Sequence, residues 1–162
     1  MVLPDINLDP ETTSGVTRIV LLACGTSYHA AIVARFLIER LTGLPAEVDV
    51  ASEWRYRDAP VGPETLVVAL SQSGEAADTL GAVKTAKARG APVIAISHPQ
   101  TRFVRPPAVL LPVGVPGVDH GGATFRTDGV VALPLAPARR AILRSPAHWL
   151  DAMRRALPER AP

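Results

Sequence analysis

Long apolar runs alternate with amphipathic segments along the first two thirds of the chain. Residues 18–23 and 65–70 are almost continuously apolar, which is typical of strands that are covered on both faces. Residues 46–50 are a short strand candidate, and apolar runs at 92–97 and 108–113 predict two further strands. Strands that alternate with helices pair in parallel through right-handed crossovers. We therefore predict an α/β fold, a flavodoxin-like three-layer α/β/α sandwich around a five-stranded parallel sheet.

The segments between these strands predict helices. Residues 28–42 place their apolar side chains on one helical stripe, and residues 75–89 form a second helix in which Leu80 and Val83 face inward. The apolar stripe of the first helix consists of Ile32, Val33, Phe36, Leu37 and Leu41. Residues 52–58 predict a short helix or a turn.

The pattern weakens after the fifth predicted strand. Residues 114–129 are rich in glycine and predict a loop, and residues 130–143 contain prolines that leave room only for a short or broken helix. Residues 146–157 predict a final amphipathic helix. We expect a single domain over residues 17–162, which follows a polar lead-in over residues 1–16.

The composition fits such a domain. The chain has 162 residues, of which 48% are hydrophobic and 20% charged, so it can bury a sizeable core. A single cysteine, Cys24, excludes an internal disulfide framework and a cysteine-based metal cluster. No other metal-ligand spacing stands out, and we expect no cofactor. Neither a signal peptide nor a membrane-spanning run is visible, so we expect a cytoplasmic protein with no membrane partner.

The net charge is only +2, although arginines gather toward the end of the chain. They are Arg139, Arg140, Arg144, Arg154, Arg155 and Arg160. Both a solvated helix face and a nucleic-acid surface fit such a cluster. Because no nucleic-acid-binding motif accompanies it, we expect no nucleic-acid partner.

Two hydroxyl-rich loops follow predicted strands at the same edge of the sheet. They are Cys24-Gly25-Thr26-Ser27 and Ser71-Gln72-Ser73-Gly74, and each precedes a predicted helix. Hydroxyls, an amide side chain and the N–H groups of a helix N-terminus are the donors that a phosphate ester needs, and Gly74 allows the backbone to approach a ligand closely. An ordinary polar N-cap explains either loop taken alone. Because the loops occur together where parallel strands end, they favour a shared small anionic ligand.

Three separate segments stand out for their order and spacing: Ala23-Cys24-Gly25-Thr26-Ser27-Tyr28, Ala51-Ser52-Glu53-Trp54-Arg55-Tyr56-Arg57 and Leu70-Ser71-Gln72-Ser73-Gly74-Glu75. They resemble the sugar isomerase (SIS) domain family, in particular the first SIS domain in the isomerase part of glucosamine-6-phosphate synthases. Ala77-Asp78-Thr79-Leu80 continues the match, and the resemblance covers about residues 18–113.

The resemblance implies a phosphosugar site, with fructose-6-phosphate or glucosamine-6-phosphate as the nearest ligands. It implies that the second loop holds the phosphate and that the first loop contacts sugar hydroxyls or phosphate. The implied ligand-binding residues are Gly25, Thr26, Ser27, Ser71, Gln72, Ser73 and Gly74. Cys24 is expected to pack in the loop rather than to act as a nucleophile. Because members of the family commonly complete their sites across subunits, we also expect a homodimer.

The chain departs from the family pattern in several places. Ala76 stands where the family usually has a phosphate-binding threonine, and residues 117–124 replace a family segment that follows the fifth strand. We expect neither a glutaminase domain nor a second SIS domain in this chain. The acid and base residues that the second SIS domain of the synthases carries then have no counterpart.

Isomerisation between an aldose and a ketose needs an acid and a base. His120, beside Asp119 in a glycine-rich loop, and Glu53, in a family-like segment, are the candidate catalytic residues. A structural or surface role remains open for His120, and a role in supporting the fold remains open for Glu53.

The sequence therefore leaves three functional hypotheses. The chain is an aminosugar-phosphate or hexose-phosphate isomerase that works as a homodimer, or a non-catalytic module that senses or carries a phosphosugar. In the third hypothesis it is a subunit that needs a separate chain with a second SIS domain or an amidotransferase.

Overall fold

The computed structural model of the chain describes residues 13–71, 74–125, 132–138, 143 and 145. The chain forms two compact units. One spans residues 8–111, and the other consists of residues 112–162 together with residues 1–7.

The larger unit is built around a five-stranded sheet with the order β2-β1-β3-β4-β5. Its strands are β1 (Arg18–Ala23), β2 (Ala46–Val50), β3 (Thr65–Leu70), β4 (Val93–Ser97) and β5 (Val109–Pro112). β1 pairs in parallel with both β2 and β3, and β3 pairs in parallel with β4. The predicted parallel α/β sheet is confirmed, with strand boundaries within a residue or two of those expected from the apolar runs.

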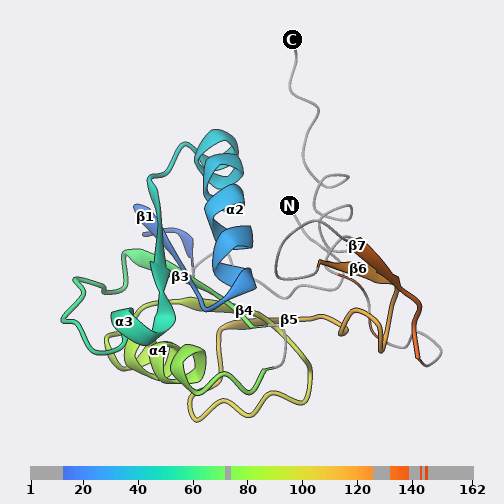
Figure 1. Ribbon diagram of the computed structural model, residues 1–162. Coiled ribbons are helices and arrows are strands. Elements are labelled where there is room, and N and C mark those ends of the chain that lie inside the picture. Colours follow the sequence, from blue (N-terminus) through green and yellow to red (C-terminus); the bar gives the residue numbers. More distant parts are fainter. Residues whose placement is uncertain (1–12, 72–73, 126–131, 139–142, 144, 146–162) are drawn as a thin grey trace. The chain divides into compact units, whose positions relative to one another are not determined.

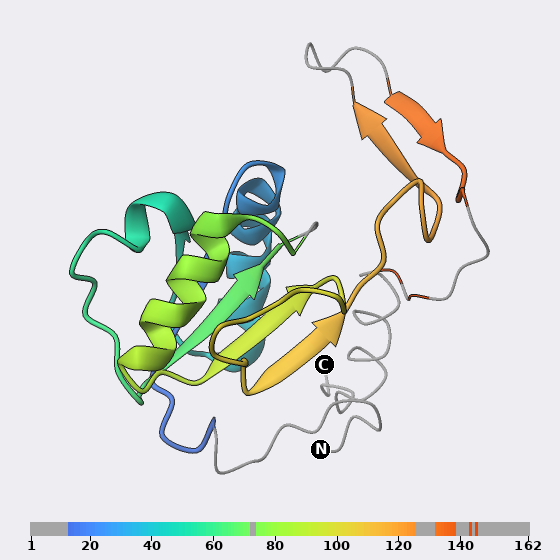
Figure 2. The same cartoon turned by 90° about the horizontal axis from the view of Figure 1, so that it is seen from below.

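Helices cover both faces of this sheet (Figures 1 and 2). They are α2 (Thr26–Thr42), α3 (Ala51–Trp54) and α4 (Ala77–Ala88). α2 packs on one face, and α3 and α4 pack on the opposite face. The connections that follow β1 and β3 therefore leave these neighbouring strands toward opposite faces. Such a divergence is a topological switch point, where α/β sheets of this kind bind their ligands.

Small and branched side chains fill the core on both faces. Val20, Leu22 and Val67 contribute to the face under α3 and α4, where Trp54 is 1% exposed. Ile19 and the other side chains of β1 that point the opposite way pack under α2. The buried core positions of β1 thus lie on both faces of the sheet, as the unbroken apolar run predicts.

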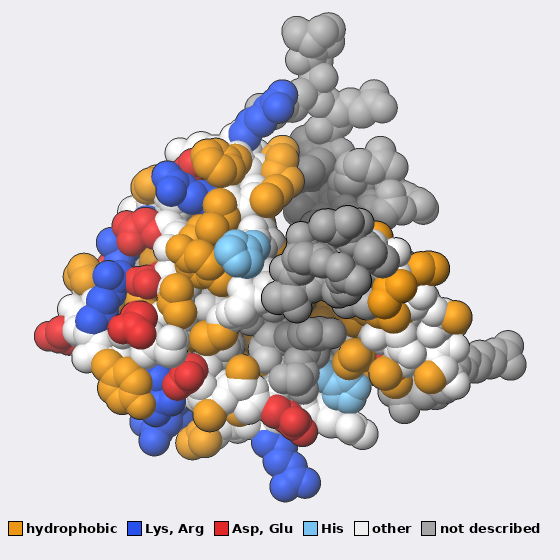
Figure 3. All heavy atoms as spheres, in the orientation of Figure 1, with side chains coloured by type: hydrophobic (Ala, Val, Ile, Leu, Met, Phe, Trp, Pro, Cys, Tyr) orange, Lys and Arg blue, Asp and Glu red, His pale blue; other side chains and the backbone are white. Residues whose placement is uncertain are grey.

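The apolar stripe of α2 does not pack on the sheet. Val33, Phe36 and Leu37 are 64%, 63% and 55% exposed, and hydrophobic side chains gather over this helix in Figure 3. The helix instead contacts the sheet through smaller side chains, with Ala31 fully buried and Ile38 half-buried. This arrangement differs from the core-facing position that an apolar stripe usually indicates.

The second unit contains a two-stranded antiparallel sheet of β6 (Gly122–Phe125) and β7 (Ala132–Leu135). The prediction of a loop over residues 114–129 is wrong at β6, and the prediction of a short or broken helix over residues 130–143 is wrong at β7. Pro134 disfavours a helix but can occupy β7, because each strand of a two-stranded sheet is an edge strand. The predicted helix over residues 146–157 falls outside the described part of the chain.

Several helix boundaries differ from the sequence predictions. α2 begins at Thr26, two residues before the predicted start. α4 begins at Ala77 rather than at residue 75, since Ala76 has an extended backbone with φ −61° and ψ 101°. α3 ends at Trp54, and the turn that follows takes up the rest of the predicted helix or turn. Among the described residues, every helix is too short or too polar to cross a membrane.

Candidate functional site

The loop after β1 leads directly into α2. Gly25 is the N-cap residue, with a φ of +58° that few residues other than glycine adopt, and α2 begins at Thr26. No side chain caps the helix, and its first turn contains no acidic residue. The Tyr28 N–H donates to the Gly25 carbonyl at 3.1 Å, whereas the N–H groups of Thr26 and Ser27 have no intrahelical carbonyl to bind. The loop therefore presents these donors beside the hydroxyls of the same two residues.

The loop after β3 is closed by its own serine. The N–H of Ser71 donates to the carbonyl of Ile96 at 3.0 Å, and its Oγ accepts the N–H of Gly74 at 3.1 Å. Gly74 is buried against the loop after β4, where Ser97 Oγ and Thr101 Oγ1 lie 2.8 Å apart. Ser71 is thus held at the end of β3, with part of its surface still accessible.

Residues from both loops line one cavity of about 260 Å³ at the carboxyl ends of β1 and β3. The lining residues are Cys24, Gly25, Thr26, Ser27, Leu70, Ser71, Ala76 and Thr79. The volume lies near the lower end of the range for small-molecule sites, roughly 300–1,000 Å³, and suits a small ligand. The structure therefore brings together four of the predicted ligand-binding residues. Gln72 and Ser73 fall outside the described residues.

The N-cap explanation of the two loops does not fit the helix starts. Thr26 and Ser27 belong to the first turn of α2 rather than preceding it, and the N-cap residue of α4 is Ala76. Neither N-cap makes a side-chain capping bond. Both helices consequently begin beside the cavity with N–H groups available to an anion.

The electrostatic field of the cavity comes from the backbone rather than from lysine or arginine. None of the described lining residues carries a formal charge at neutral pH, whereas two helix N-termini contribute partial positive charge. Asp78, in the first turn of α4, would oppose this field. Its carboxylate is paired with the Arg55 guanidinium at 2.9 Å, which reduces that opposition.

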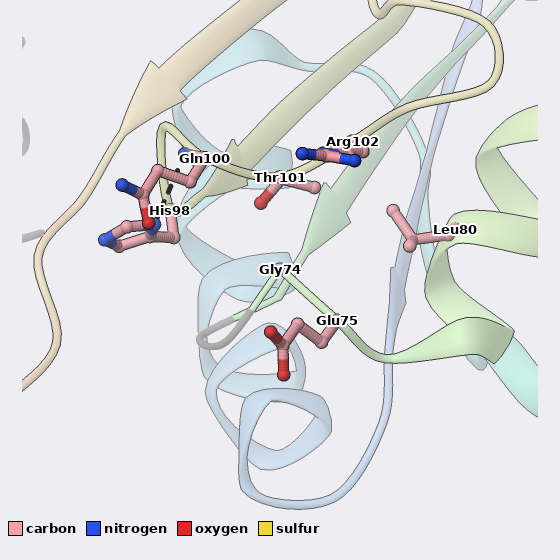
Figure 4. A pocket seen from close by; sticks show the side chains of 7 residues that line it. All are labelled: Gly74, Glu75, Leu80, His98, Gln100, Thr101 and Arg102. Atoms are coloured by element: carbon pink, nitrogen blue, oxygen red, sulfur yellow. Dashed lines mark hydrogen bonds between the residues drawn. The ribbon is translucent and has the colours of Figure 1, made fainter.

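A larger cavity of about 850 Å³ lies between the start of α4 and the loop after β4 (Figure 4). Its lining residues are Gly74, Glu75, Leu80, His98, Gln100, Thr101 and Arg102. The predicted ligand-binding residue Gly74 therefore faces this cavity rather than the smaller one. The loop after β4 is held by the Gln100 N–H, which lies 3.3 Å from His98 Nδ1. No pattern in the sequence indicates this cavity, because its polar residues form no recognisable motif.

The segment around Glu53 acts in the fold. Trp54, the last residue of α3, is buried, Arg55 pairs with Asp78, and the guanidinium of Arg57 pairs with the carboxylate of Asp49. Glu53 itself is exposed and lines neither cavity among the described residues. The described contacts of this family-like segment thus stabilise the packing of α3 rather than form the cavity.

His120 belongs to the second unit and is bound within its own loop. Its Nε2 lies 3.1 Å from the carbonyl oxygen of Gly114 and its Nδ1 lies 2.6 Å from that of Gly121. The neighbouring Asp119 is fully buried, and its carboxylate accepts the Val115 N–H at 2.9 Å. These contacts give both residues a structural role in closing the loop.

Thr79 is a cavity residue that the sequence analysis did not select. It is the third residue of α4 and lies one helical turn after Ala76, so the two positions share a helix face. The three-residue spacing between Ala76 and Thr79 is the one sequence feature that could have indicated a role for Thr79 at the site. Within the described residues, no group of three or more His, Cys, Asp or Glu side chains is placed to hold a metal ion.

A doubly wound parallel domain with two uncapped helix N-termini at its switch point belongs to the class of α/β ligand-binding domains. The SIS domain family model matches residues 14–108, and the chain belongs to the SIS domain family. This result confirms the family resemblance found in the sequence.

The chain is similar to part of much longer enzymes. It is 47% identical over 96 residues to the glutamine–fructose-6-phosphate aminotransferase (isomerizing) of Clostridium perfringens. That match covers 59% of this chain and 16% of the enzyme. The Xylella fastidiosa enzyme of the same name is 59% identical over 76 residues, which are 47% of this chain and 12% of the enzyme. The chain thus corresponds to a small part of the relatives it matches.

Solved structures agree with this assignment. The C-terminal domain of the glucosamine-fructose-6-phosphate aminotransferase from Francisella tularensis superposes with a TM-score of 0.65 at 35% identity. The match covers 77% of this chain and 35% of that one. Glucosamine-6-phosphate deaminase from Thermotoga maritima, at 22% identity, has a TM-score of 0.54 and covers 60% of this chain and 31% of its own. The second likeness shows the fold alone.

Proposed function

We propose that the chain binds a phosphorylated sugar in the smaller cavity, at the carboxyl ends of β1 and β3. One observation carries the proposal: the hydroxyls of Thr26, Ser27 and Ser71 and the uncapped N-termini of α2 and α4 border the same small space. Neutral donors and helix N-termini suit a phosphate ester, whose oxygens accept several hydrogen bonds at once. Ser73 and Gln72 add donors to this loop in the proposal.

The relatives indicate which sugar phosphates to consider. Their names contain fructose-6-phosphate and glucosamine-6-phosphate, so we propose these two as ligands and aminosugar or hexose-phosphate isomerisation as the reaction context. Because the matched region is 16% of the relative from Clostridium perfringens, the activity of the whole enzyme need not reside in the matched segment. We further propose a homodimer located in the cytoplasm.

A second candidate, a non-catalytic sensor or a subunit that depends on a partner chain, is favoured by the chemistry of the cavity wall. The described lining residues include no carboxylate, imidazole or amine. A proton-transferring group for isomerisation would therefore come from elsewhere, either from Glu53 or His120 in this chain or from a second SIS-domain or amidotransferase chain. The two candidate functions share the sugar-phosphate site and differ in catalysis.

Binding can be tested by thermal unfolding of the full chain with glucosamine-6-phosphate, fructose-6-phosphate and their unphosphorylated sugars. At a ligand concentration one hundred times Kd, the linkage contribution is about 2.7 kcal/mol, which raises Tm by about 5–10 °C. We expect this shift with the phosphorylated sugars and little shift with glucosamine or fructose. Equal shifts with both forms would contradict recognition of the phosphate.

A variant of Ser71 tests whether the sugar phosphate binds in this cavity. Ser71→Ala removes the hydroxyl that accepts the Gly74 N–H, and we expect it to weaken binding at least about tenfold by calorimetry. Ser52→Ala is the matched control, because Ser52 lies on α3 and lines neither described cavity. Equal affinity of the two variants would place the ligand elsewhere.

A coupled assay of aldose–ketose interconversion, with Glu53→Gln and His120→Asn, then separates an enzyme from a binding module.

A further inference from the structure

Thr79 has a buried hydroxyl with no hydrogen-bond partner among the described residues. The residue is 1% exposed, and its Oγ1 neither donates nor accepts. A threonine inside a helix usually bonds back to the carbonyl three or four residues earlier. Thr79 does not, although its neighbour Leu80 makes the regular helical bond from its N–H to the Ala76 carbonyl at 3.0 Å.

The position of Thr79 explains why a ligand is a suitable partner. It stands in the first turn of α4 and lines the cavity together with Ser71, Thr26 and Ser27. The first-turn N–H groups of the same helix also lack intrahelical partners. A hydroxyl and several backbone donors are therefore concentrated on one wall of one small cavity. Buried polar groups in native proteins are nearly always paired, so an unpaired one at a cavity needs an explanation.

We propose that Thr79 is a ligand-binding residue whose Oγ1 hydrogen-bonds an oxygen of the sugar phosphate. This inference rests on the function proposed above. It adds to the site a residue that lies outside the two hydroxyl-rich loops. The hydroxyl of Thr79, which lacks a partner among the described residues, gains one when the cavity is occupied. The site thus includes the first turn of α4 as well as the loop before it.

The test compares Thr79→Val with Thr85→Val in the full chain. Valine keeps the shape of threonine and removes the hydroxyl, and Thr85 is a matched control on the same helix outside the cavity. Two measurements are made: Tm without ligand, and Kd for glucosamine-6-phosphate and fructose-6-phosphate by calorimetry. For Thr79→Val we expect an unchanged or higher Tm without ligand and an affinity about tenfold weaker. Thr79→Ser should keep most of the affinity.

Each other outcome contradicts the proposal in a distinct way. A Thr79→Val chain that unfolds at clearly lower temperature, or fails to fold, shows that the hydroxyl already has a partner in the protein. Unchanged affinity in Thr79→Val, with a wild-type chain that binds the phosphosugar, overturns the role of Thr79 alone. If the wild-type chain binds neither phosphosugar, the proposed function fails, and the role of Thr79 fails with it.

Discussion

Gly74 is subject to two constraints, one from its backbone and one from its surroundings. Its φ is +71°, and a Cβ at this position would lie 1.7 Å from Thr101 Oγ1. Gly43, at the end of α2, has almost the same φ of +72° but has nothing within 4 Å of the position of a Cβ. A comparison of the two glycines therefore separates the cost of backbone strain, which both share, from the cost of steric overlap, which only Gly74 has.

We expect Gly74→Ala to lower the free energy of unfolding by about 3 kcal/mol, since left-handed strain and overpacking add. Gly43→Ala should cost only about 1 kcal/mol, because strain acts alone. Urea denaturation of both variants measures the difference. Equal losses would show that the loop after β4 moves aside without cost.

At this scale the sequence identifies hydroxyls but not their partners. Ser71 and Thr26 are recognisable because they follow apolar runs within a familiar pattern. Thr79 and Arg55 are not, since their importance depends on a missing hydrogen bond in one case and on an ion pair to Asp78 in the other. Such features arise from contacts between elements, and no local pattern of residue types encodes them.

Among the elements, α2 shows where periodicity misleads. Its stripe of large apolar residues is regular, yet the helix rests on the sheet through Ala31 and its neighbours. The hydrophobic pattern predicts a helix over residues 28–42, close to the observed Thr26–Thr42, but it does not say which side of the helix meets the sheet. A small residue permits close approach to a flat sheet, and this steric requirement has no signature in hydrophobicity alone.

We expect Ala31→Leu to destabilise the chain by about 1–3 kcal/mol, because a larger side chain does not fit where Ala31 is fully buried. Phe36→Ser, in contrast, should change stability by less than about 0.5 kcal/mol, since Phe36 is 63% exposed. Chemical denaturation of the two variants provides the measurement. A large loss with Phe36→Ser would mean that the exposed side of α2 is covered in solution.

For the molecule as a whole, the alternation of strands and helices was enough to predict the parallel sheet, and the three family-like segments were enough to predict the SIS family. The C-terminal part was harder. Its strands β6 and β7 are only four residues each and contain glycine and proline, residues that usually indicate loops. Pairing between two such strands, rather than their own composition, makes them a sheet.

The sheet order predicts how protection from hydrogen exchange is distributed. β1 and β3 each have a paired strand on both sides, whereas β2 is an edge strand and β6 and β7 form an isolated pair. Opening β1 or β3 requires disruption of the main sheet, while a two-stranded sheet is marginally stable by itself. We therefore expect the amides of β1 and β3 to exchange most slowly, those of β2 faster, and those of β6 and β7 fastest.

Exchange followed by mass spectrometry on the full chain, with and without glucosamine-6-phosphate, measures this order. Ligand should add protection at the starts of α2 and α4, because their first-turn N–H groups face the proposed site, and should leave the amides of β2 unchanged. Strong protection of β6 and β7 would contradict the expected order, since it would require a covering partner for strands whose described side chains in β7 are mostly exposed. Protection that rises equally everywhere would instead indicate global stabilisation without a local contact, and would argue against binding at the two helix starts.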